Sequence, residues 1–474
     1  MMKSINRYII NLGSILLFSG LFFGGPQTAS ALSIEDEESL GRKFLAHVRQ
    51  YYDFVDDDFA NEYINELGKY LIKPLKTRHF PFNFYIIKNS ELNAFAGPGG
   101  HIFIFTGLIE AMDRIDELAA VICHEIGHVS SRHLSDRIKK SKTIGLATLA
   151  GILVGSLLGG EVAGAVITGS VAAGIQKQLS YSRNDERQAD QLGFKYTSEA
   201  GFESSALKSS LEKLQRRQLG MENIPAYLLT HPGGPERMSN IESMLASYPP
   251  SSKREETARF SSIYPCFKTI LRARYLEAHD AERSFNDDLN KDPDSPLAHF
   301  GLGIVLKEMS EYPEAIGHFQ KALKELSETL PVLRYLGETY QLNGQDQEAI
   351  KTFEKALKIN DEDKSSLFLL AASYRNQNEY SRAVSIYERL VSMEPVKDEV
   401  FYNLGVSLGR QNRLGLAHYN FGIYFQRLEK KQKADFHFQK AKELSGNDSF
   451  LKKRIRKAME DMKKKKPAPH RPAP

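Results

Sequence analysis

The stretch VICHEIGHVSSRH, from Val121 to His133, decides what the first half of this chain can be. It contains His124, Glu125 and His128 in the pattern H-E-x-x-H. On a helix, residues four apart lie about 40° apart around the axis and roughly 6 Å along it, so both imidazoles can reach one divalent ion. Zinc prefers nitrogen ligands, and a catalytic zinc site keeps one position for water. The spacing therefore predicts a zinc site in which Glu125 lies beside the water.

The alternative is that these polar side chains simply pack in a core. The preceding residues 118–122 are all apolar, which predicts a buried helix. Buried imidazoles and carboxylates need polar partners, so packing alone explains them poorly. Because H-E-x-x-H is a short motif, the metal hypothesis depends on a further ligand elsewhere in the chain.

The third ligand has two candidate sources. A metzincin would need a histidine six residues after His128, but the sequence has a leucine there. His133 is one residue short and on a different helical face, which favours a structural or surface role. The stretch YSRNDERQAD, residues 181–190, instead offers Glu186 and Asp190, again four apart. Glu186 can complete the shell, and Asp190 can accept the second ring N–H of a ligand histidine. Taken alone, Glu186 could equally be a surface carboxylate.

HEIGHVSSRH followed by SRNDERQAD resembles the gluzincin metalloproteases of the CAAX prenyl endopeptidase and HtpX type, with their BepA-type periplasmic members. The resemblance runs from about residue 39 to 243. It implies an α+β zincin-like domain, mostly helical, with a small sheet whose edge strand lines the cleft. It also implies His124, His128 and Glu186 as ligands of one Zn²⁺ ion, with Glu125 as the general base for peptide hydrolysis.

Two further site residues take their roles from the resemblance. Asp190 is implied as the companion acid. Thr230-His231-Pro232, with Arg237 beyond it, resembles a second signature of the family, and a histidine before proline lies on a loop that can approach the metal. His231 would either donate a hydrogen bond to the oxyanion of the tetrahedral intermediate or occupy the open zinc position. A turn histidine without metal contact is the remaining alternative.

The segment before the zinc helix predicts the sheet. Residues 81–88 alternate as a strand does, and residues 93–109 predict a short strand, a Gly-Pro-Gly-Gly turn and a second strand. The resemblance implies that Asn93, Ala94 and Phe95 bind substrate from an edge strand. An unpaired edge binds an extended peptide through backbone hydrogen bonds. A plain hairpin that faces away from the zinc is the alternative.

The second half of the chain repeats with the 34-residue period of tetratricopeptide helix pairs. In each repeat a small residue comes first, then an alanine, then an aromatic residue: Gly303, Ala315 and Phe319; Gly337, Ala349 and Phe353; Ala371, Ala383 and Tyr387; Gly405, Ala417 and Phe421. Ala281 with Phe285 continues the phase backward, and Ala434, Phe438 and Ala441 predict a closing helix. The expected module is an all-α solenoid with a concave face for protein partners.

The chain start and end predict targeting and tail segments. Residues 1–31 combine a basic start, an apolar core and a small-x-small site, typical of a signal peptide cleaved after Ala31. An uncleaved anchor is the alternative. The expected domains are the signal peptide at 1–31, a metalloprotease domain at 32–255, a repeat domain at 256–447 and a basic, Pro-rich disordered tail at 448–474. Secretion would place the mature protein in the periplasm.

The charge balance argues against a nucleic-acid partner. The chain carries 63 basic and 59 acidic side chains, a net charge of +4. Residues 451–474 alone hold ten basic and two acidic groups. The basic character therefore belongs to the tail and does not indicate a nucleic-acid-binding face. The two cysteines, Cys123 and Cys266, exclude a disulfide framework.

Residues 143–175 leave three interpretations open. This segment is rich in glycine and aliphatic residues and contains one charge, Glu161. It could form a helical hairpin packed on the protease or over its cleft, contact the membrane surface peripherally, or span the membrane, although each half is short for a span.

These features predict a secreted zinc endopeptidase with a partner-binding repeat module. The resemblance implies that it hydrolyses misfolded or stalled outer-membrane and periplasmic proteins, and that its repeats bind envelope proteins such as an assembly machinery. A second hypothesis is a repeat-based chaperone or scaffold for outer-membrane assembly whose zinc site is mostly closed. A third, weaker one is a protease attached to the membrane through residues 143–175.

Overall fold

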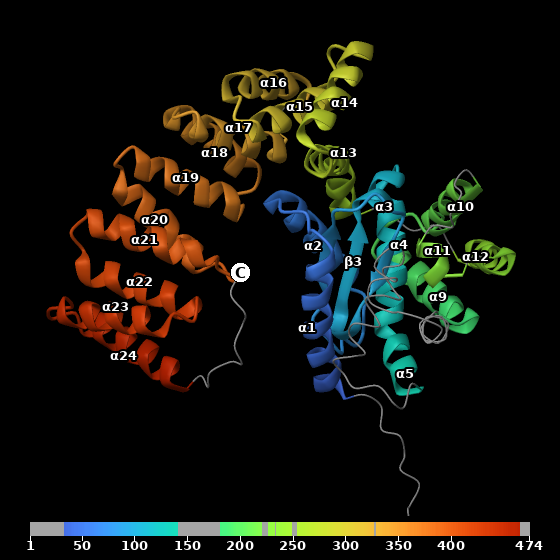
Figure 1. The fold of residues 1–474 in the computed structure, drawn as a ribbon, viewed down its shortest axis with the longest axis horizontal. Helices are drawn as coiled ribbons and strands as arrows, with labels where there is room; N and C mark the ends of the chain where they lie inside the picture. The colour runs from blue at the N-terminus through green and yellow to red at the C-terminus, as the bar shows by residue number, and fades with distance from the viewer. Residues whose placement is uncertain are drawn as a thin grey trace, which may run out of the picture.

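The computed structural model describes residues 33–140, 181–219, 226–232, 234–248, 254–326 and 329–464 (Figure 1). The predicted signal peptide and the segment 143–175 lie outside these residues. The first domain contains α1 (Ile34–Tyr51), α2 (Asp58–Leu71), β1 (Asn83–Ile87), β2 (Ala94–Ala96), the 3-10 turn η1 (Pro98–Gly100), β3 (His101–Phe105), α3 (Thr106–Ala111), α4 (Ile115–Ser130), α5 (His133–Lys140), α9 (Arg183–Glu199), α10 (Ala206–Leu219), α11 (Ala226–Thr230) and α12 (Pro235–Ser247). The expected class, a mostly helical α+β domain, is confirmed.

The described strands form one sheet in the order β1-β3-β2. β1 pairs parallel with β3, and β2 pairs antiparallel with it, with Phe95 opposite Phe103. The turn between β2 and β3 needs glycine, because Gly99 and Gly100 have φ angles of 72° and 81°. A Cβ on Gly100 would also lie 2.6 Å from the Pro81 carbonyl oxygen. The predicted hairpin is therefore confirmed, and β2 is an edge strand of the described sheet.

Both faces of β3 are covered, so all its residues are buried. On one face, Phe95 and Phe103 pack with Phe44 of α1 in an aromatic core. On the other face, Ile102 and Ile104 belong to the larger core that includes the apolar side of α4. A strand buried on both faces reads as a continuous apolar run, as HIFIF does. The sheet thus holds α4 at a fixed place behind β2 and β3.

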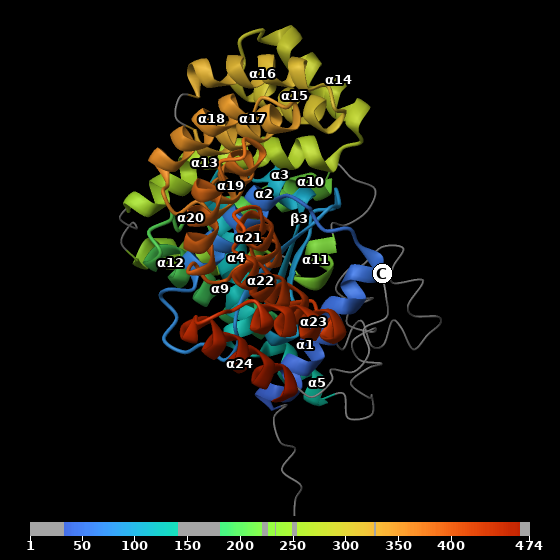
Figure 2. The same ribbon diagram turned by 90° about the vertical axis from the view of Figure 1, so that its left-hand side faces the viewer.

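The repeat domain follows without a break in the core. Its helices are α13 (Glu255–Tyr275), α14 (Ala278–Lys291), α15 (Pro296–Glu308), α16 (Tyr312–Glu325), α17 (Leu330–Leu342), α18 (Asp346–Ile359), α19 (Lys364–Asn376), α20 (Tyr380–Val391), α21 (Asp398–Arg410), α22 (Leu414–Arg427), α23 (Lys431–Glu443) and α24 (Ser449–Lys464). The array rises from α13, arches over the first domain and descends on the side of α1 and α2 (Figures 1 and 2).

The small and aromatic positions of the repeats meet as the period predicts. A Cβ on Gly303 would lie 2.8 Å from the Phe319 ring, and one on Gly337 would lie 2.6 Å from the Phe353 ring. The repeat alanines are buried as well. The predicted closing helix is α23, where Phe438 is fully buried. The solenoid is therefore confirmed.

The prediction of a disordered tail from residue 448 is wrong for residues 449–464, which form α24. Leu451, Ile455 and Ala458 lie on one face of this helix and pack in a small core with Phe438. The many lysines around this apolar stripe conceal it in the sequence. The helix covers the end of the array, as terminal repeats generally must. Residues 465–474 lie outside the description.

Helix α13 joins the two domains. At its middle, the Tyr264 hydroxyl donates to the carbonyl oxygens of Ile109 and Met112 in the first domain. Near its end, Arg272 pairs with Asp288 of α14 at 2.6 Å. The border expected between residues 255 and 256 thus falls at the first turn of a helix that packs against both domains.

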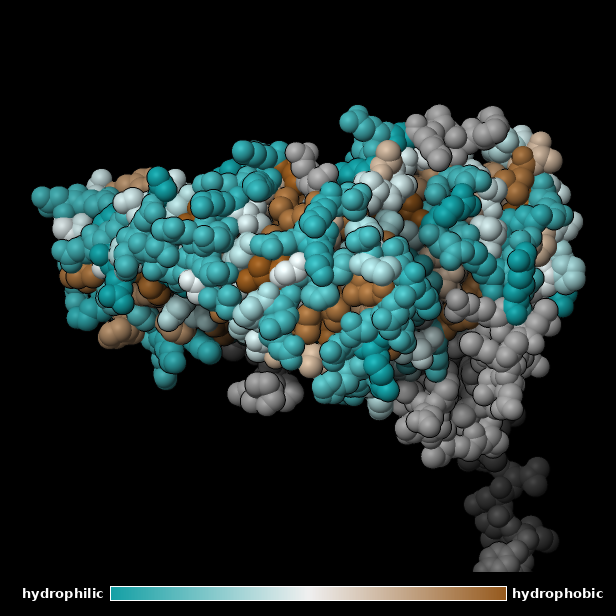
Figure 3. Space-filling view, turned by 90° about the horizontal axis from the view of Figure 1, so that it is seen from above, coloured by the Kyte–Doolittle hydropathy of each residue, from teal (hydrophilic) through white to brown (hydrophobic). Residues whose placement is uncertain are grey.

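Hydrophilic and apolar side chains are interspersed over both domains on the face seen from above (Figure 3). Within the described residues, no helix combines the length and the apolar character that are needed to cross a membrane.

Candidate metal centre

Helix α4 presents His124, Glu125 and His128 inside the domain, where all three are at most 1% exposed. At the start of the helix the Glu117 carboxylate reaches back to the residues before Ile115, accepting the backbone N–H of Asp113 at 2.8 Å and that of the cap residue Arg114 at 3.4 Å. The apolar residues of α4 pack in the core along its length. The histidines lie one turn apart on one face, as predicted.

Helix α9 brings the carboxylates. It begins with a capping box, in which the Ser182 hydroxyl accepts the Asp185 N–H and the Asp185 carboxylate accepts the Ser182 N–H. α9 crosses α4 at close range, because a Cβ on Gly193 would lie 3.0 Å from the Cα of His124. This close crossing places Glu186 against the histidines.

Four donor side chains converge at this crossing. The Nε2 atoms of His124 and His128 are 3.0 Å apart. The Glu186 carboxylate lies 3.5 Å from the first and 3.4 Å from the second. With His231, these residues each offer one ligand atom within 4.8 Å of the others. The structure thus brings together the three predicted ligands and adds a fourth.

His231 follows α11 and is fully buried. Its Nδ1 lies 3.0 Å from Glu186 Oε1 and 3.3 Å from His124 Nε2. The Tyr227 ring stacks on the imidazole with centroids 4.5 Å apart, and the backbone N–H of His231 donates to the Tyr227 carbonyl at 2.8 Å. The loop therefore holds this histidine within the donor cluster.

Asp190 lies behind the cluster. Its Oδ1 is 2.9 Å from Nδ1 of His124, the ring nitrogen that faces away from the other donors. Arg237 of α12 binds the same carboxylate through two hydrogen bonds of 2.8 and 2.7 Å. Arg237 Nη1 also lies 2.9 Å from Glu186 Oε2. The guanidinium thus fixes both carboxylates, and Asp190 orients His124.

Among the described residues, no donor is in good hydrogen-bond geometry with either carboxylate oxygen of Glu125, although both oxygens are buried and the backbone N–H of Ala96 lies close to them. Its nearest described cation candidate is His231, whose Nε2 is 3.5 Å from Oε1. Burial raises the pKa of Glu125, while His231, His124 and the Ala96 N–H oppose that shift. A buried carboxylate without well-placed partners beside a donor cluster suits a site completed by a bound group and water.

Burial and neighbouring charges shift the pKa values of the clustered side chains in different directions. Burial alone would lower the pKa of His124, but the Asp190 and Glu186 carboxylates raise it to about 9. Burial lowers the pKa of His128 well below its ordinary value. For Glu186, the surrounding imidazoles outweigh burial and hold the pKa low. Two imidazoles and a carboxylate around one point are the donor set that zinc prefers.

The sequence missed His133 and Gln188 as parts of this site. His133 is buried, and its Nδ1 lies 3.0 Å from Nδ1 of His128. Its Nε2 lies 3.0 Å from Oε1 of Gln188 on α9. The expectation of a structural or surface role assumed that α4 continues through His133. The helix instead ends at Ser130, and Arg132 turns the chain with a φ of 52°.

The predicted substrate-binding residues lie at the edge strand. Asn93 precedes β2, and its carbonyl accepts the Phe105 N–H at 3.0 Å. The Phe95 ring stacks on Phe103 at 4.9 Å, in the core on the α1 side, so it points away from the donor cluster. Ala94 and Ala96 belong to the core on the α4 side. The backbone of β2, rather than the Phe95 side chain, therefore lies next to Glu125.

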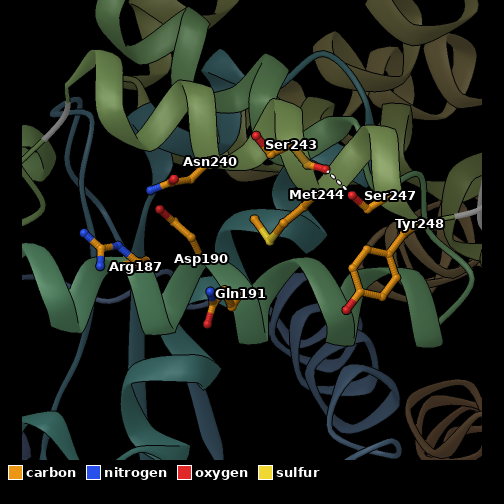
Figure 4. Close-up of a pocket in the computed structure, with 8 residues that line it drawn as sticks. All are labelled: Arg187, Asp190, Gln191, Asn240, Ser243, Met244, Ser247 and Tyr248. Carbon is orange, nitrogen blue, oxygen red and sulfur yellow. Dashed lines mark hydrogen bonds between the residues drawn. The ribbon is translucent and has the colours of Figure 1, made fainter.

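A surface hollow of about 260 Å³ opens between α9 and α12 (Figure 4). Arg187, Asp190 and Gln191 rise from α9, while Asn240 and Met244 face them from α12. Of the donor cluster and its immediate partners, the hollow reaches only Asp190. It is therefore a hollow behind the donor cluster and not an approach to Glu125.

Comparison with known proteins agrees with this geometry. Residues 59–245 match the family described as Peptidase family M48, and residues 368–418 match Tetratricopeptide repeat. Residues 308–390 also match the family described as Anaphase-promoting complex, cyclosome, subunit 3.

The similar curated proteins carry related names. The chain is 27% identical to the beta-barrel assembly-enhancing protease of Yersinia pestis over 64% of this chain and 62% of that protein. It is 32% identical to the Escherichia coli (strain K12) protein of the same name over 46% of each chain. The matches thus span about half to three fifths of these relatives. Among solved structures, that of MamA protein covers 33% of this chain and 85% of that one, at 20% identity and a TM-score of 0.31.

Proposed function

Since this chain joins a peptidase family M48 domain to tetratricopeptide repeats, we propose that it is a zinc-dependent endopeptidase of the bacterial cell envelope. The observation that carries the proposal is the buried convergence of His124, His128 and Glu186 beside the Glu125 carboxylate, which is buried without a well-placed donor among the described residues. Protein packing alone would leave these donors crowded and Glu125 unsatisfied. A divalent cation with a water molecule accounts for both features.

The residues divide the chemistry between them. His124, His128 and Glu186 would hold the zinc ion, which when bound supplies Lewis-acid polarisation of the peptide carbonyl and acidifies water. Glu125 takes the proton of the attacking water on its carboxylate and passes it to the leaving amine. Burial raises the pKa of Glu125, which makes its carboxylate a stronger base for the first half of this transfer. Asp190 and Arg237 hold the ligands in place.

The edge strand supports a polypeptide substrate. β2 has a paired side toward β3 and a second side next to α4 and Glu125. An extended peptide laid along that second side would gain backbone hydrogen bonds whatever its sequence. Such binding suits an enzyme that degrades misfolded or stalled outer-membrane and periplasmic proteins, the substrate class that we propose from the named relatives. The repeats would bind envelope partners, and the proposed location is the periplasm.

The substitution Glu125→Gln tests the mechanism. It removes the general base but none of the proposed ligands, so we expect unchanged zinc content by metal analysis and complete loss of peptide hydrolysis. A Glu125→Gln variant that still cleaves protein substrates would exclude this mechanism. Loss of zinc in the same variant would instead mean that Glu125 is a ligand.

A second candidate function is a chaperone or scaffold with a mostly closed zinc site. The observation that favours it is His231, which adds a fourth donor to the cluster. Four protein ligands are typical of structural zinc sites, whereas a catalytic site leaves a position open. Complementation of a deletion strain separates the two functions. Full rescue of envelope integrity by Glu125→Gln, together with no rescue by a chain lacking the repeats, would favour the scaffold.

A further inference from the structure

The two ligand histidines of α4 are oriented from behind by different residues. His124 has the Asp190 carboxylate at 2.9 Å from its Nδ1. Among the described residues, no carboxylate lies within hydrogen-bond distance of the Nδ1 of His128. Its partner there is another imidazole, that of His133, at 3.0 Å between the two Nδ1 atoms. The tight turn at Arg132, with a φ of 52°, folds the chain back and brings His133 under His128.

The proton positions on the two rings determine which histidine donates in this hydrogen bond. Nε2 of His128 faces Glu186 and His124, so a metal ligand at this position must leave Nε2 without a proton. A neutral imidazole then carries its proton on Nδ1 and donates it to Nδ1 of His133. His133 must in turn carry its own proton on Nε2. That nitrogen lies 3.0 Å from Gln188 Oε1, which is an acceptor.

We propose that His133, backed by Gln188, is a positioning residue that fixes the tautomer and the ring direction of His128 for metal binding. The assignment rests on the proposed function, since it takes the donor cluster as a zinc site. His128 donates to His133, and His133 donates to Gln188. These hydrogen bonds therefore fit one arrangement of the ring protons. Partners behind a ligand histidine raise its affinity for metal in the same way that carboxylates do.

The position of His133 supports this role over simple packing. The side chain is 5% exposed, and both ring nitrogens have polar contacts. The Tyr181 ring covers the other side of His128 with centroids 3.8 Å apart. His128 is thus held by ring stacking on one side and by the His133 hydrogen bond at its edge. A side chain of equal volume without an acceptor would keep the packing but leave the Nδ1–H of His128 unpaired.

Zinc affinity of the full chain, measured by competition with a chromogenic chelator, tests the proposal. We expect His133→Leu to bind zinc about 10–100-fold more weakly than the unsubstituted protein. We expect His133→Asn to retain most of the affinity, because its side-chain oxygen can accept the same proton. His279→Leu, at a side chain 83% exposed, controls for the loss of any histidine and should bind zinc normally. Equal affinity of His133→Leu and the unsubstituted protein, or equal weakness of the Leu and Asn variants, would overturn the proposal.

Nitrogen-15 NMR of the metal-free protein gives a readout independent of zinc. His128 should be in the Nδ1–H tautomer in the unsubstituted chain and in His133→Asn, and in mixed tautomers in His133→Leu. If His133→Leu fails to fold, Gln188→Met provides the test, because Gln188 is exposed and its replacement should not disturb the fold. We expect mixed tautomers of His128 in this variant as well. If the unsubstituted protein binds no zinc, the proposed function fails. If it binds zinc but His128 shows no tautomer preference, only the role of His133 fails.

Discussion

Arg237 is the cation that permits two carboxylates to stay buried beside the histidines. It is 7% exposed and contacts both Asp190 and Glu186. Removing one partner of a buried ion pair leaves an uncompensated charge and costs about 3–5 kcal/mol. We therefore expect Arg237→Met to lower the free energy of unfolding of the metal-free protein by about that amount in urea titrations.

The matched control for Arg237 is Arg187→Met on α9. Arg187 pairs with Glu236 at 2.6 Å, but both side chains are about half exposed. An exposed pair contributes roughly 0–1 kcal/mol, so this variant should unfold almost as the unsubstituted protein does. Similar losses in the two variants would show that Arg237 does not neutralise the buried carboxylates.

The substitution His231→Ala distinguishes the two roles that the sequence left open. If His231 fills the fourth coordination position, its removal opens that position, so we expect weaker zinc binding together with faster peptide hydrolysis. If His231 instead supports the oxyanion, the loss of one such donor costs about 10²–10³ in kcat. The geometry favours the first outcome, because His231 Nδ1 lies 3.0 Å from Glu186, among the donors. Steady-state kinetics at saturating zinc shows whether the variant hydrolyses peptides faster or more slowly than the unsubstituted protein.

At the residue scale, the sequence predicted the side chains whose spacing follows helix geometry. His124 and His128 share one face because their spacing matches one helical turn, whereas Glu186 meets them only through the crossing of α4 and α9. His133 could not be placed in the same way, since its contact with His128 depends on the single left-handed residue Arg132. The substrate role expected for Phe95 concerned the backbone of the edge strand and stays a prediction; its ring lies on the opposite face, as the period of a strand requires.

The crossing of α4 and α9 depends on a residue without a side chain. A Cβ at Gly193 would lie 3.0 Å from the backbone of His124. To accommodate it, α9 would have to move outward by a few tenths of an ångström. Gly193→Ala should therefore separate Glu186 from the imidazoles, weaken zinc binding and destabilise the protein by about 1–3 kcal/mol. Zinc competition and thermal unfolding measure both effects.

Gly317 on α16 is the control for this substitution, since a Cβ there meets nothing within 4 Å. Gly317→Ala removes the glycine cost in a helix and should stabilise the protein by about 0.5–1 kcal/mol. If Gly193→Ala stabilised the protein to the same extent, close packing of the two helices would not limit the site.

The helix pair α15 and α16 carries a pH-dependent contact. Nδ1 of His299 and Nδ1 of His318 are 2.9 Å apart. Burial, followed by His299 and Lys321, lowers the pKa of His318 from 6.5 to about 4. A histidine whose pKa is lower in the folded state favours folding above pH 6.5, and this contribution is lost as the pH falls from 6.5 towards 4.

We therefore expect the melting temperature of the full chain to fall between pH 7.5 and pH 5. His318→Asn keeps a donor toward His299 without a titrating ring, because Nε2 of His299 already donates to the Pro293 carbonyl. Its melting temperature should fall less over the same range. Identical pH profiles of the variant and the unsubstituted protein would assign the acid sensitivity to other groups.

At the element scale, periodicity predicted most of the repeat array. Gly303 and Phe319 meet as their spacing requires, because each repeat buries its aromatic ring against a small residue. The final helix α24 was not predicted, since it lies outside the 34-residue phase and its Leu451 and Ile455 are surrounded by lysines and arginines. The composition therefore predicted a disordered tail. In the structure, three apolar residues are enough to pack this helix against the end of the array.

At the scale of the whole molecule, the array is fixed against helix α2. The Asp57 side chain accepts a hydrogen bond from the Tyr335 hydroxyl of α17. Further along, Lys397 lies 2.6 Å from Asp58. These pairs join residues that are roughly 280 and 340 positions apart in the chain, so no local pattern in the sequence could predict them. They mark where the repeats contact the domain that contains the candidate metal centre.

Arg334 is the central residue of this docking. It is 6% exposed, lies 2.7 Å from Glu62 of α2 and 3.4 Å from Asp363 of α19, and covers the Phe59 ring at 5.2 Å. Arg334→Met keeps much of the apolar contact but leaves Asp363 buried without its cation. We expect a loss of about 3–5 kcal/mol and a calorimetric trace in which the two domains unfold separately.

The control for Arg334 is Lys397→Met, which removes the pair with Asp58, where both side chains are at least half exposed. This variant should change the unfolding free energy by less than about 1 kcal/mol and keep a single transition. Limited proteolysis gives the second measurement, because release of the array should expose the link between the domains in Arg334→Met alone. A single unshifted transition in Arg334→Met would show that the continuous apolar core through α13, and not this charge cluster, holds the repeats against the first domain.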